Sequence, residues 1–324
     1  MIFPAFLKPQ DTIGITAPSA GIAAEDHAAF DLSLSRIQAK GYRTVETASV
    51  RAGGIVSAPA DVRARELNSL LGDPAVSMVW CACGGDFLLD MLPFVDFQAV
   101  AKQPKWVQGY SDPTSLLYTL TTRHDIATIY GANAGGFDEE NVPAHAQYAL
   151  NLIGGNLAPQ HSFETFTHRF RDEGEQAVVW EMPRGDFTAR GRLLGGCLDC
   201  LSDILGTPYD GTADFIERYR KDGIIWYFDI FALPAEAVYR TLWRMRENGW
   251  FATAKAVMVG RVCFPSSQMD LTYRDMIMQA LPDLPLVLEA DVGHVPPRMT
   301  MINGALATLT TSDGKGTLTM SLEE

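Results

Sequence analysis

Positive charge is scarce in this chain of 324 residues. Lysine and arginine total 26 against 39 aspartates and glutamates, which leaves a formal net charge of −13. The acidic residues are spread along the chain, and the basic residues form no cluster. Because nucleic-acid binding depends on grouped lysine and arginine side chains that contact phosphates, the sequence argues against a nucleic-acid partner.

Long apolar segments are also missing. No stretch reaches the roughly 18 apolar residues that a membrane-spanning helix needs. The opening MIFPAFLKPQDT has no basic region before its short apolar part, which a secretory leader would have. We therefore expect a cytoplasmic protein without a membrane partner.

Cysteine is sparse as well, and the five residues form an odd set: Cys81, Cys83, Cys197, Cys200 and Cys263. In a chain with 47% apolar residues they are expected to be reduced and mostly buried. Cys197 and Cys200 form a CxxC within the apolar helical pattern GGCLDCLSDILG, without a second CxxC or a histidine pair at zinc spacing. We interpret this CxxC as structural and expect no metal and no cofactor.

Strand and helix patterns alternate over residues 1–150. DTIGITAPS predicts a strand that ends at a loop, and residues 23–40 carry apolar side chains at helical spacing with Gly41 after them. VSMVWCAC and KWVQGYS are runs typical of buried parallel strands, and each precedes a turn or helix. This order predicts an N-terminal α/β domain with a parallel sheet.

The alternation weakens over residues 151–190, which we interpret as an inter-domain crossing. It resumes over 191–324, where the strand-like segments GRLLGGC, IIWYFDI, AKAVMVGRV and LPLVLEADVGH alternate with helical ones. The tail GALATLTTSDGKGTLTM predicts two strands around Asp313-Gly314, a hairpin signal. We expect a second, smaller C-terminal α/β domain that ends in this β-hairpin.

Ser111 lies where the strand KWVQGYS gives way to a helix that begins DPTSLLYTL. Asp112 suits the N-cap of that helix, and Pro113 suits its first position. A serine at such a turn projects its hydroxyl from the sheet edge, where backbone N–H groups can stabilise an oxyanion. Most serines in this setting are only turn residues, so Ser111 indicates a nucleophile only together with other signals.

Two further segments carry such signals. Gly84-Gly85 puts flexible backbone at the carboxyl edge of the sheet, where open α/β sheets bind ligands, although a plain turn has the same sequence. His294 follows PLVLEADVG and precedes two prolines, so it lies in a rigid loop at a strand end, where an imidazole can be aimed. We interpret the remaining histidines as surface or structural residues: His27, His124, His145, His161 and His168.

Five segments together resemble the LD-carboxypeptidase family of serine peptidases, family S66, which includes the microcin C self-immunity hydrolases. They are LKPQDTIGITAPS, CGGDFLLDMLPFVDF, GYSDPTSLLYTL with IATIYGAN after it, GRLLGGCLDCLSDILGTPYD and DVGHVPP. The resemblance implies a triad of serine, glutamate and histidine. When the roles of the family's residues are assigned to the matching motifs of this chain, the resemblance implies that Ser111 is the nucleophile and His294 is the base. It implies that the backbone amides of Gly85 and Asp112 bind the oxyanion. The resemblance also implies that the protein forms a homodimer.

The third member of the triad departs from the family pattern. Relatives usually have a glutamate at the end of the strand that corresponds to IIWYFDI, and the register fixed by Arg240 places Asp229 there. Asp229 is one methylene shorter, but an aspartate orients an imidazole equally well. Asp291 and Glu289 are rivals near His294, although their alternation along one strand favours a scaffold role.

The resemblance implies an acyl-enzyme hydrolase that cleaves an L,D amide bond and releases terminal D-Ala from murein tetrapeptides during peptidoglycan recycling. An alternative is a microcin-immunity-type hydrolase acting on peptidyl or aminoacyl nucleotides, because such members carry an aromatic loop between their domains. The candidates to stack on a base, or simply to pack at the junction, are Phe163, Phe166, Phe170 and Trp180.

A third alternative is a catalytically silent binding protein, in which Asp229 marks decay of the triad. The retention of Ser111, His294 and the Gly84-Gly85 turn argues against this alternative, because decay usually removes the nucleophile or the base first.

Overall fold

The computed structural model describes residues 1–168, 171 and 173–322. Internal contacts divide the chain into two compact units, Met1–Asn156 and Leu157–Glu324. Residues 157–190, which the sequence predicts as part of a crossing, group with the second unit and carry three short strands and the start of a longer one. In the described part of the chain, no helix combines the length and apolar character needed to span a membrane.

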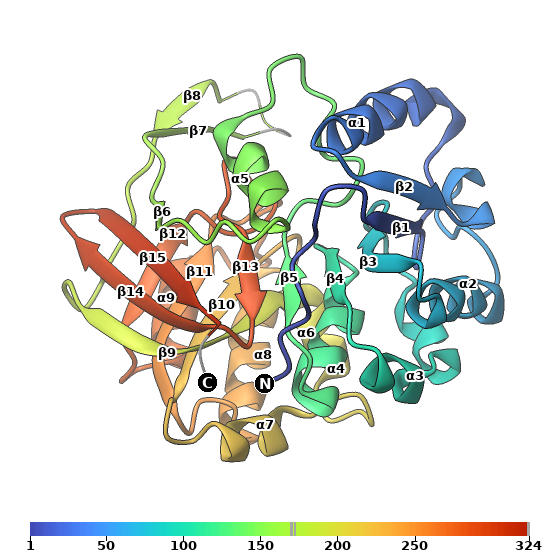
Figure 1. The fold of residues 1–324 in the computed structure, drawn as a ribbon. Helices are drawn as coiled ribbons and strands as arrows, with labels where there is room; N and C mark the ends of the chain where they lie inside the picture. Colours follow the sequence, from blue (N-terminus) through green and yellow to red (C-terminus); the bar gives the residue numbers. More distant parts are fainter. Residues whose placement is uncertain (169–170, 172, 323–324) are drawn as a thin grey trace. The chain divides into compact units, whose positions relative to one another are not determined.

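A parallel sheet forms the centre of the first unit (Figure 1). Its strands lie in the order β5-β4-β3-β1-β2, and every neighbouring pair among them is parallel. The strands are β1 (Thr12–Thr16), β2 (Arg43–Glu46), β3 (Val76–Cys81), β4 (Trp106–Gly109) and β5 (Thr128–Tyr130). All residues of β1, β4 and β5 are buried, which explains their nearly continuous apolar and small residues. The predicted parallel sheet is confirmed.

Helices follow each of these strands along the chain. They are α1 (His27–Ala39), α2 (Ala60–Gly72), α3 (Phe97–Lys102), α4 (Thr114–His124) and α5 (Ala144–Leu152), with 3-10 turns at Ala24–Asp26, Ala48–Arg51 and Leu89–Phe94. The helix predicted over 23–40 is α1 with the turn before it, and it buries Phe30, Leu34 and Ile37. In α4, residues 114–122 are all buried, so this helix is anchored in the core directly after the turn that carries Ser111.

The second unit is built on a mixed sheet in the order β12-β11-β10-β9-β14-β15-β6. Strands β9 to β12 are parallel, and β14, β15 and β6 add to them in antiparallel fashion. The strands are β6 (Gln160–His161), β9 (Thr188–Cys197), β10 (Ile224–Asp229), β11 (Ala254–Gly260), β12 (Leu286–Ala290), β14 (Leu306–Ser312) and β15 (Lys315–Ser321). The other elements are β7 (Thr165–Thr167), β8 (Glu175–Ala177), β13 (Met301–Asn303), α6 (Leu198–Ile204), α7 (Thr212–Arg218), α8 (Ala235–Glu247) and α9 (Tyr273–Ala280).

The predicted terminal hairpin is present between β14 and β15. Ser312 pairs with Lys315, and the two residues between them, Asp313 and Gly314, have φ of 49° and 77°. Positive φ at both central residues is what a two-residue type I′ turn requires, so the Asp-Gly pair sets the register of the strands.

Strand β10 lies inside the second unit and carries a charged residue at its end. All six of its residues, IIWYFD, are buried, and the Trp226 ring stacks with both Phe228 and Trp250, at centroid distances of 5.8 and 5.3 Å. Asp229 is the last residue of the strand and is fully buried. A buried carboxylate is costly unless it is paired, so its surroundings point to a site.

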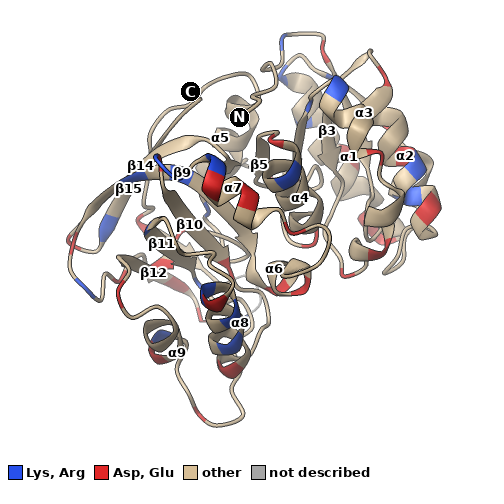
Figure 2. Cartoon of the chain, turned by 90° about the horizontal axis from the view of Figure 1, so that it is seen from below, with Lys and Arg blue, Asp and Glu red and all other residues tan. Residues whose placement is uncertain are grey.

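Acidic and basic side chains are interspersed on the helices and do not form a field of one sign, as α2 and α8 show (Figure 2). Helix α8, for example, carries Arg244 and Arg246 close to Glu247. This mixture is typical of a solvated helix face.

Candidate active site

Ser111 lies in the turn between β4 and α4 with a backbone φ of 69°. This left-handed conformation costs a non-glycine residue roughly 1–2 kcal/mol, and such backbone strain concentrates at functional sites. The Ser111 carbonyl accepts a hydrogen bond from the N–H of Thr114 at 2.9 Å, which ties the serine to the first turn of the buried helix. The turn therefore holds Ser111 in one fixed conformation.

The Gly84-Gly85 turn lies directly beside this serine. A Cβ on Gly84 would stand 3.0 Å from Ser111 Cβ and 3.1 Å from its Oγ. Gly85 has φ of 143°, and a Cβ there would come within 2.2 Å of the Ser19 hydroxyl. A side chain at Gly84 would therefore crowd Ser111, and a side chain at Gly85 would overlap Ser19, so the close approach of this turn to both serines requires glycine.

Asp112 has a different structural role from the one its position in the sequence suggests. The N-cap of α4 is Pro113, so the expected capping role of Asp112 is wrong. Its buried carboxylate accepts hydrogen bonds from the Ser19 hydroxyl and from the N–H of Leu88, so it joins the loops that follow β1, β3 and β4. Burial raises the pKa of Asp112, and the Ser19 hydrogen bond partly opposes this.

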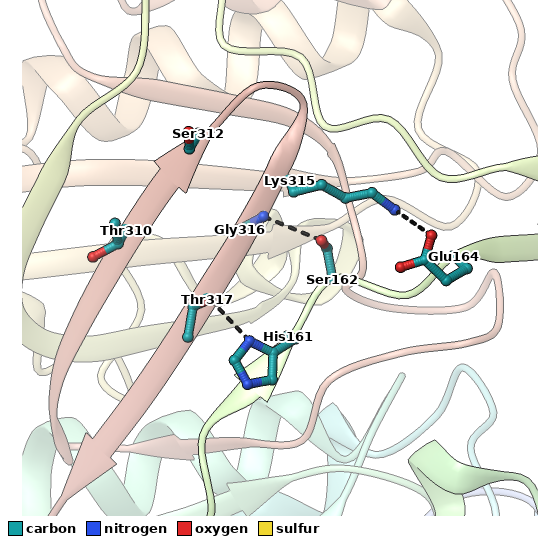
Figure 3. A pocket seen from close by; sticks show the side chains of 8 residues that line it. All are labelled: His161, Ser162, Glu164, Thr310, Ser312, Lys315, Gly316 and Thr317. Carbon is teal, nitrogen blue, oxygen red and sulfur yellow. Dashed lines mark hydrogen bonds and ion pairs between the residues drawn. The ribbon is translucent and has the colours of Figure 1, made fainter.

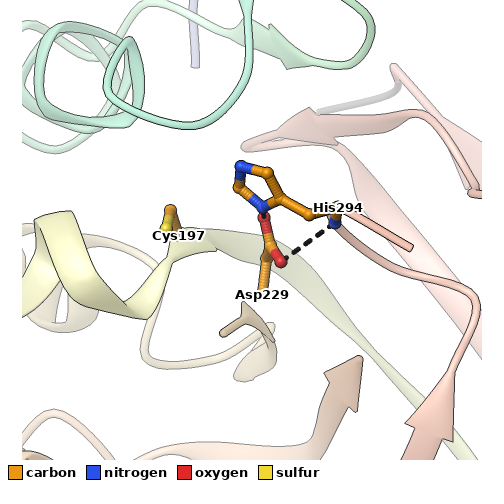
Figure 4. A group of neighbouring side chains, drawn as sticks. All are labelled: Cys197, Asp229 and His294. Atoms are coloured by element: carbon orange, nitrogen blue, oxygen red, sulfur yellow. Dashed lines mark hydrogen bonds and ion pairs between the residues drawn. The ribbon is translucent and has the colours of Figure 1, made fainter. Parts of the chain in front are cut away.

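Asp229 and His294 are in contact in the second unit (Figure 4). His294 Nδ1 lies 2.7 Å from Asp229 Oδ2, and Asp229 Oδ1 accepts the backbone N–H of His294 at 3.1 Å. With Nδ1 facing a carboxylate, the favoured tautomer carries its proton there and leaves Nε2 as the basic nitrogen.

Gly293 allows the His294 loop to reach the short carboxylate. Its φ is 98°, and a Cβ at this position would stand only 1.9 Å from Asp229 Oδ1. No other residue fits without displacing the loop or the aspartate.

Replacing Gly293 with alanine is expected to separate His294 from Asp229 and to lower the rate at which a fluorophosphonate probe labels Ser111. The left-handed φ alone costs about 1–2 kcal/mol of unfolding free energy, and the overlap with Asp229 adds to this cost. Gly249→Ala is the matched control, because Gly249 has φ of 78° and a Cβ there would meet no atom within 4 Å. It should lose similar backbone energy but keep wild-type labelling. Equal labelling rates in the two variants would contradict the role of Gly293.

Asp291, one of the two rival carboxylates, is engaged elsewhere. Its Oδ1 pairs with Arg261 Nη2 at 2.6 Å, and its Oδ2 accepts the Phe163 N–H and Trp180 Nε1, each at 3.0 Å. Glu289, the other rival, has its side chain exposed. The contacts therefore give Asp291 the scaffold role that the sequence favours, and they leave Asp229 as the carboxylate against the imidazole.

Asp199 is a supporting residue that the sequence did not reveal. It lies inside the CLDC segment, and its carboxylate accepts three backbone N–H groups from Phe231, Ala232 and Leu233 at 2.9–3.1 Å. The Phe231 ring in turn packs on the His294 imidazole at a centroid distance of 4.6 Å. Asp199 thus fixes the loop after β10 that supports the histidine. An aspartate in the first turn of a helix is so ordinary that its sequence gives no signal of this distant contact.

The aromatic residues of 161–190 lie in different surroundings. Trp180 is 1% exposed, donates to Asp291, and packs so closely on Gly316 that a Cβ there would stand 2.0 Å from its ring. Phe166 is half-buried under the Arg261 guanidinium, 4.5 Å from its ring centroid. Phe170 lies outside the described residues. Trp180 is therefore a core residue in this structure and not a free stacking surface.

A polar pocket lies over β6, β14 and β15 (Figure 3). Its groups bond to one another: His161 Nδ1 contacts the Thr317 hydroxyl at 3.0 Å, and Lys315 Nζ pairs with Glu164 at 3.2 Å. Lys315 is thus already paired with a carboxylate at the edge of the pocket. The pocket contains no residue of the predicted triad.

The predicted site residues thus fall into two groups. Ser111, Asp112 and Gly85 lie in the first unit, gathered at the carboxyl ends of β3 and β4. Asp229 and His294 lie in the second unit, in contact with each other at the ends of β10 and β12.

Comparison with known proteins relates both units to one family. Models of the LD-carboxypeptidase N-terminal and C-terminal domains match residues 13–131 and 190–309. A probable murein peptide carboxypeptidase of Bacillus subtilis is 26% identical over an alignment of 332 positions. The alignment covers 99% of this chain and 95% of the relative. The microcin C7 self-immunity protein MccF of Escherichia coli is 28% identical over 249 residues, which cover 68% of this chain and 70% of the relative. The solved structure of MccF in complex with glutamyl sulfamoyl guanosine has a TM-score of 0.81 at 20% identity over 99% of both chains, which shows a shared fold.

Proposed function

This chain belongs to the LD-carboxypeptidase family, and on that premise we propose that it is a serine hydrolase that cleaves an L,D amide bond by an acyl-enzyme mechanism. The observation that supports the proposal most directly is the buried Asp229 carboxylate against the His294 imidazole, 2.7 Å apart. A charge buried at a strand end stabilises a fold poorly, whereas the same pair orients and supports a general base.

In the proposed mechanism the two groups of residues act on one substrate carbonyl. His294 Nε2 takes the proton of the Ser111 hydroxyl as Oγ attacks, and Asp229 stabilises the imidazolium that forms. The amides of Gly85 and Asp112 bind the oxyanion. His294 then gives the proton to the leaving amine, which departs as the free amino acid. A water molecule, deprotonated by the same imidazole, hydrolyses the ester at Ser111 and regenerates the hydroxyl.

The proposed substrate is a murein tetrapeptide, from which the enzyme releases the terminal D-Ala. The support is the relative described as a probable murein peptide carboxypeptidase, which aligns over 99% of this chain. The alternative substrate is an aminoacyl or peptidyl nucleotide, supported by the similarity to MccF. The burial of Trp180 counts against this alternative, because this ring is not available to stack on a base.

A direct comparison of the two substrates tests the proposal. The purified protein is given a muramyl tetrapeptide and an aminoacyl sulfamoyl adenylate in separate reactions, and free amino acids are identified by mass spectrometry. We expect D-alanine from the tetrapeptide with wild type and none above background with Ser111→Ala. If an amino acid is released from the adenylate and none from the tetrapeptide, the alternative substrate, an aminoacyl or peptidyl nucleotide, would replace the proposed one. If neither substrate is cleaved and a fluorophosphonate fails to label Ser111, the protein is a silent binding protein.

A further inference from the structure

Cys197, Asp229 and His294 bring three kinds of metal-binding atom together in the second unit (Figure 4). Cys197 ends β9 and lies in register opposite Asp229 at the end of β10. The His294 loop rests on the same aspartate through its backbone N–H. A thiol sulfur, a carboxylate oxygen and an imidazole nitrogen all lie within 4.8 Å of one another, and the three residues are buried.

This donor set fits one class of ion. Zn²⁺ and Cd²⁺ accept sulfur, nitrogen and oxygen together, with bonds of about 2.0–2.3 Å to Zn²⁺ in a tetrahedral arrangement. A thiolate donor excludes the hard cations Mg²⁺ and Ca²⁺, which prefer oxygen. Charge also fits, because one thiolate and one carboxylate balance a divalent cation, and a buried cluster without net charge avoids the cost of an isolated ion.

We propose that Cys197, Asp229 and His294 form an inhibitory site for a thiophilic divalent cation such as Zn²⁺. This inference goes against our expectation from the sequence that the CxxC is structural and that the protein takes no metal. Its binding part depends only on these three side chains, whereas its inhibitory part rests on the proposed serine-hydrolase function.

Inhibition follows from the chemistry of the imidazole. A neutral ring has one proton and one free lone pair, and the working base needs the lone pair on Nε2. An ion bound at Nδ1 moves the ring proton to Nε2, and an ion bound at Nε2 occupies the lone pair itself. In either case His294 cannot accept the proton of Ser111. The one proton released to solvent on binding is that of the Cys197 thiol.

Cadmium titration of the metal-free protein tests binding without any need for activity. We expect the ultraviolet sulfur-to-cadmium charge-transfer band to saturate at one ion per chain. Cys197→Ser should weaken Cd²⁺ binding by at least about 100-fold, more than the loss of an outer partner does, and Cys197→Ala serves as a second variant with its folding checked by thermal unfolding. Cys200→Ser and Cys263→Ser are matched controls that remove neighbouring thiols, and they should keep the band. An undiminished band in the Cys197 variants, or no band in wild type, would overturn the site.

Fluorophosphonate labelling of Ser111 tests inhibition separately. Saturating Zn²⁺ should slow labelling of wild type by at least about 10-fold, with recovery on adding EDTA, and it should not change the labelling rate of Cys197→Ala. A general base contributes about 10²–10⁴-fold to the rate of such a step, so blocking it should slow labelling by more than this lower limit. Labelling that is unaffected by a bound ion would overturn the inhibitory role. If the metal-free protein is not labelled at all but the cadmium band appears, the serine-hydrolase proposal fails and the metal site stands.

Discussion

Replacing Ser111 with alanine is expected to lower kcat for release of D-alanine by about 10⁶-fold, the loss seen when the nucleophile of a serine protease is removed. Alanine adopts the left-handed conformation of Ser111 at much the same backbone cost, so the substitution removes the hydroxyl and leaves the turn as it is. The free D-alanine formed under saturating tetrapeptide is measured by mass spectrometry against a no-enzyme blank.

The control for this experiment is folding. Denaturant unfolding of Ser111→Ala should stay within about 0.5 kcal/mol of wild type, as is usual where no buried contact is lost. A variant that is equally stable but retains more than a tenth of the wild-type rate would show that another group is the nucleophile, and the proposed mechanism would be wrong.

The Asp229→Asn variant is expected to lower kcat by about 10³- to 10⁴-fold, because an amide leaves the imidazole in the wrong tautomer. The asparagine oxygen can still accept the backbone N–H of His294, so the loop keeps its position. Its NH₂ group, however, then faces Nδ1 and favours the tautomer with the proton on Nε2. Steady-state kinetics with the tetrapeptide should show the loss in kcat, with little change in KM.

Asp291→Asn is the matched control for Asp229→Asn. Asp291 is as buried as Asp229, but its oxygens bind Arg261, Trp180 and the Phe163 backbone. Its replacement should lower the unfolding midpoint by weakening the Arg261 pair and should reduce kcat far less. The reverse pattern, with a fully active Asp229→Asn and an inactive Asp291→Asn, would move the orienting role to Asp291.

Much of the fold is visible in the sequence where burial is complete. The runs of β3 and β10 are apolar along their length because both faces of a parallel strand are covered. The Asp313-Gly314 pair marks its hairpin because few other residues accept positive φ. In contrast, β2 escaped prediction because its residues RTVE are largely exposed and show no apolar pattern. The strands β6, β7 and β8 have only two or three residues each, which is too short to show an alternating apolar pattern in the sequence.

The candidate site was only partly predictable, for a related reason. Ser111 and His294 could be proposed because each follows a recognisable strand, and the motif of the family supplied their roles. Contacts between segments far apart in sequence have no such signal. The Asp112 carboxylate reaches Ser19 in place of capping its helix, and Cys197 adjoins Asp229 because two strands pair in a particular register. These placements depend on the tertiary fold and leave no pattern along the chain.

The left-handed backbone at Ser111 has an evolutionary consequence. Glycine adopts this conformation without the penalty that a serine bears there, so a mutation that deletes the hydroxyl in favour of glycine would make the folded protein more robust. Protein stability therefore does nothing to preserve the hydroxyl at this position. Under the proposed function, selection for hydrolysis is what would keep serine at this position, and a descendant freed from that selection would be expected to drift to glycine here early.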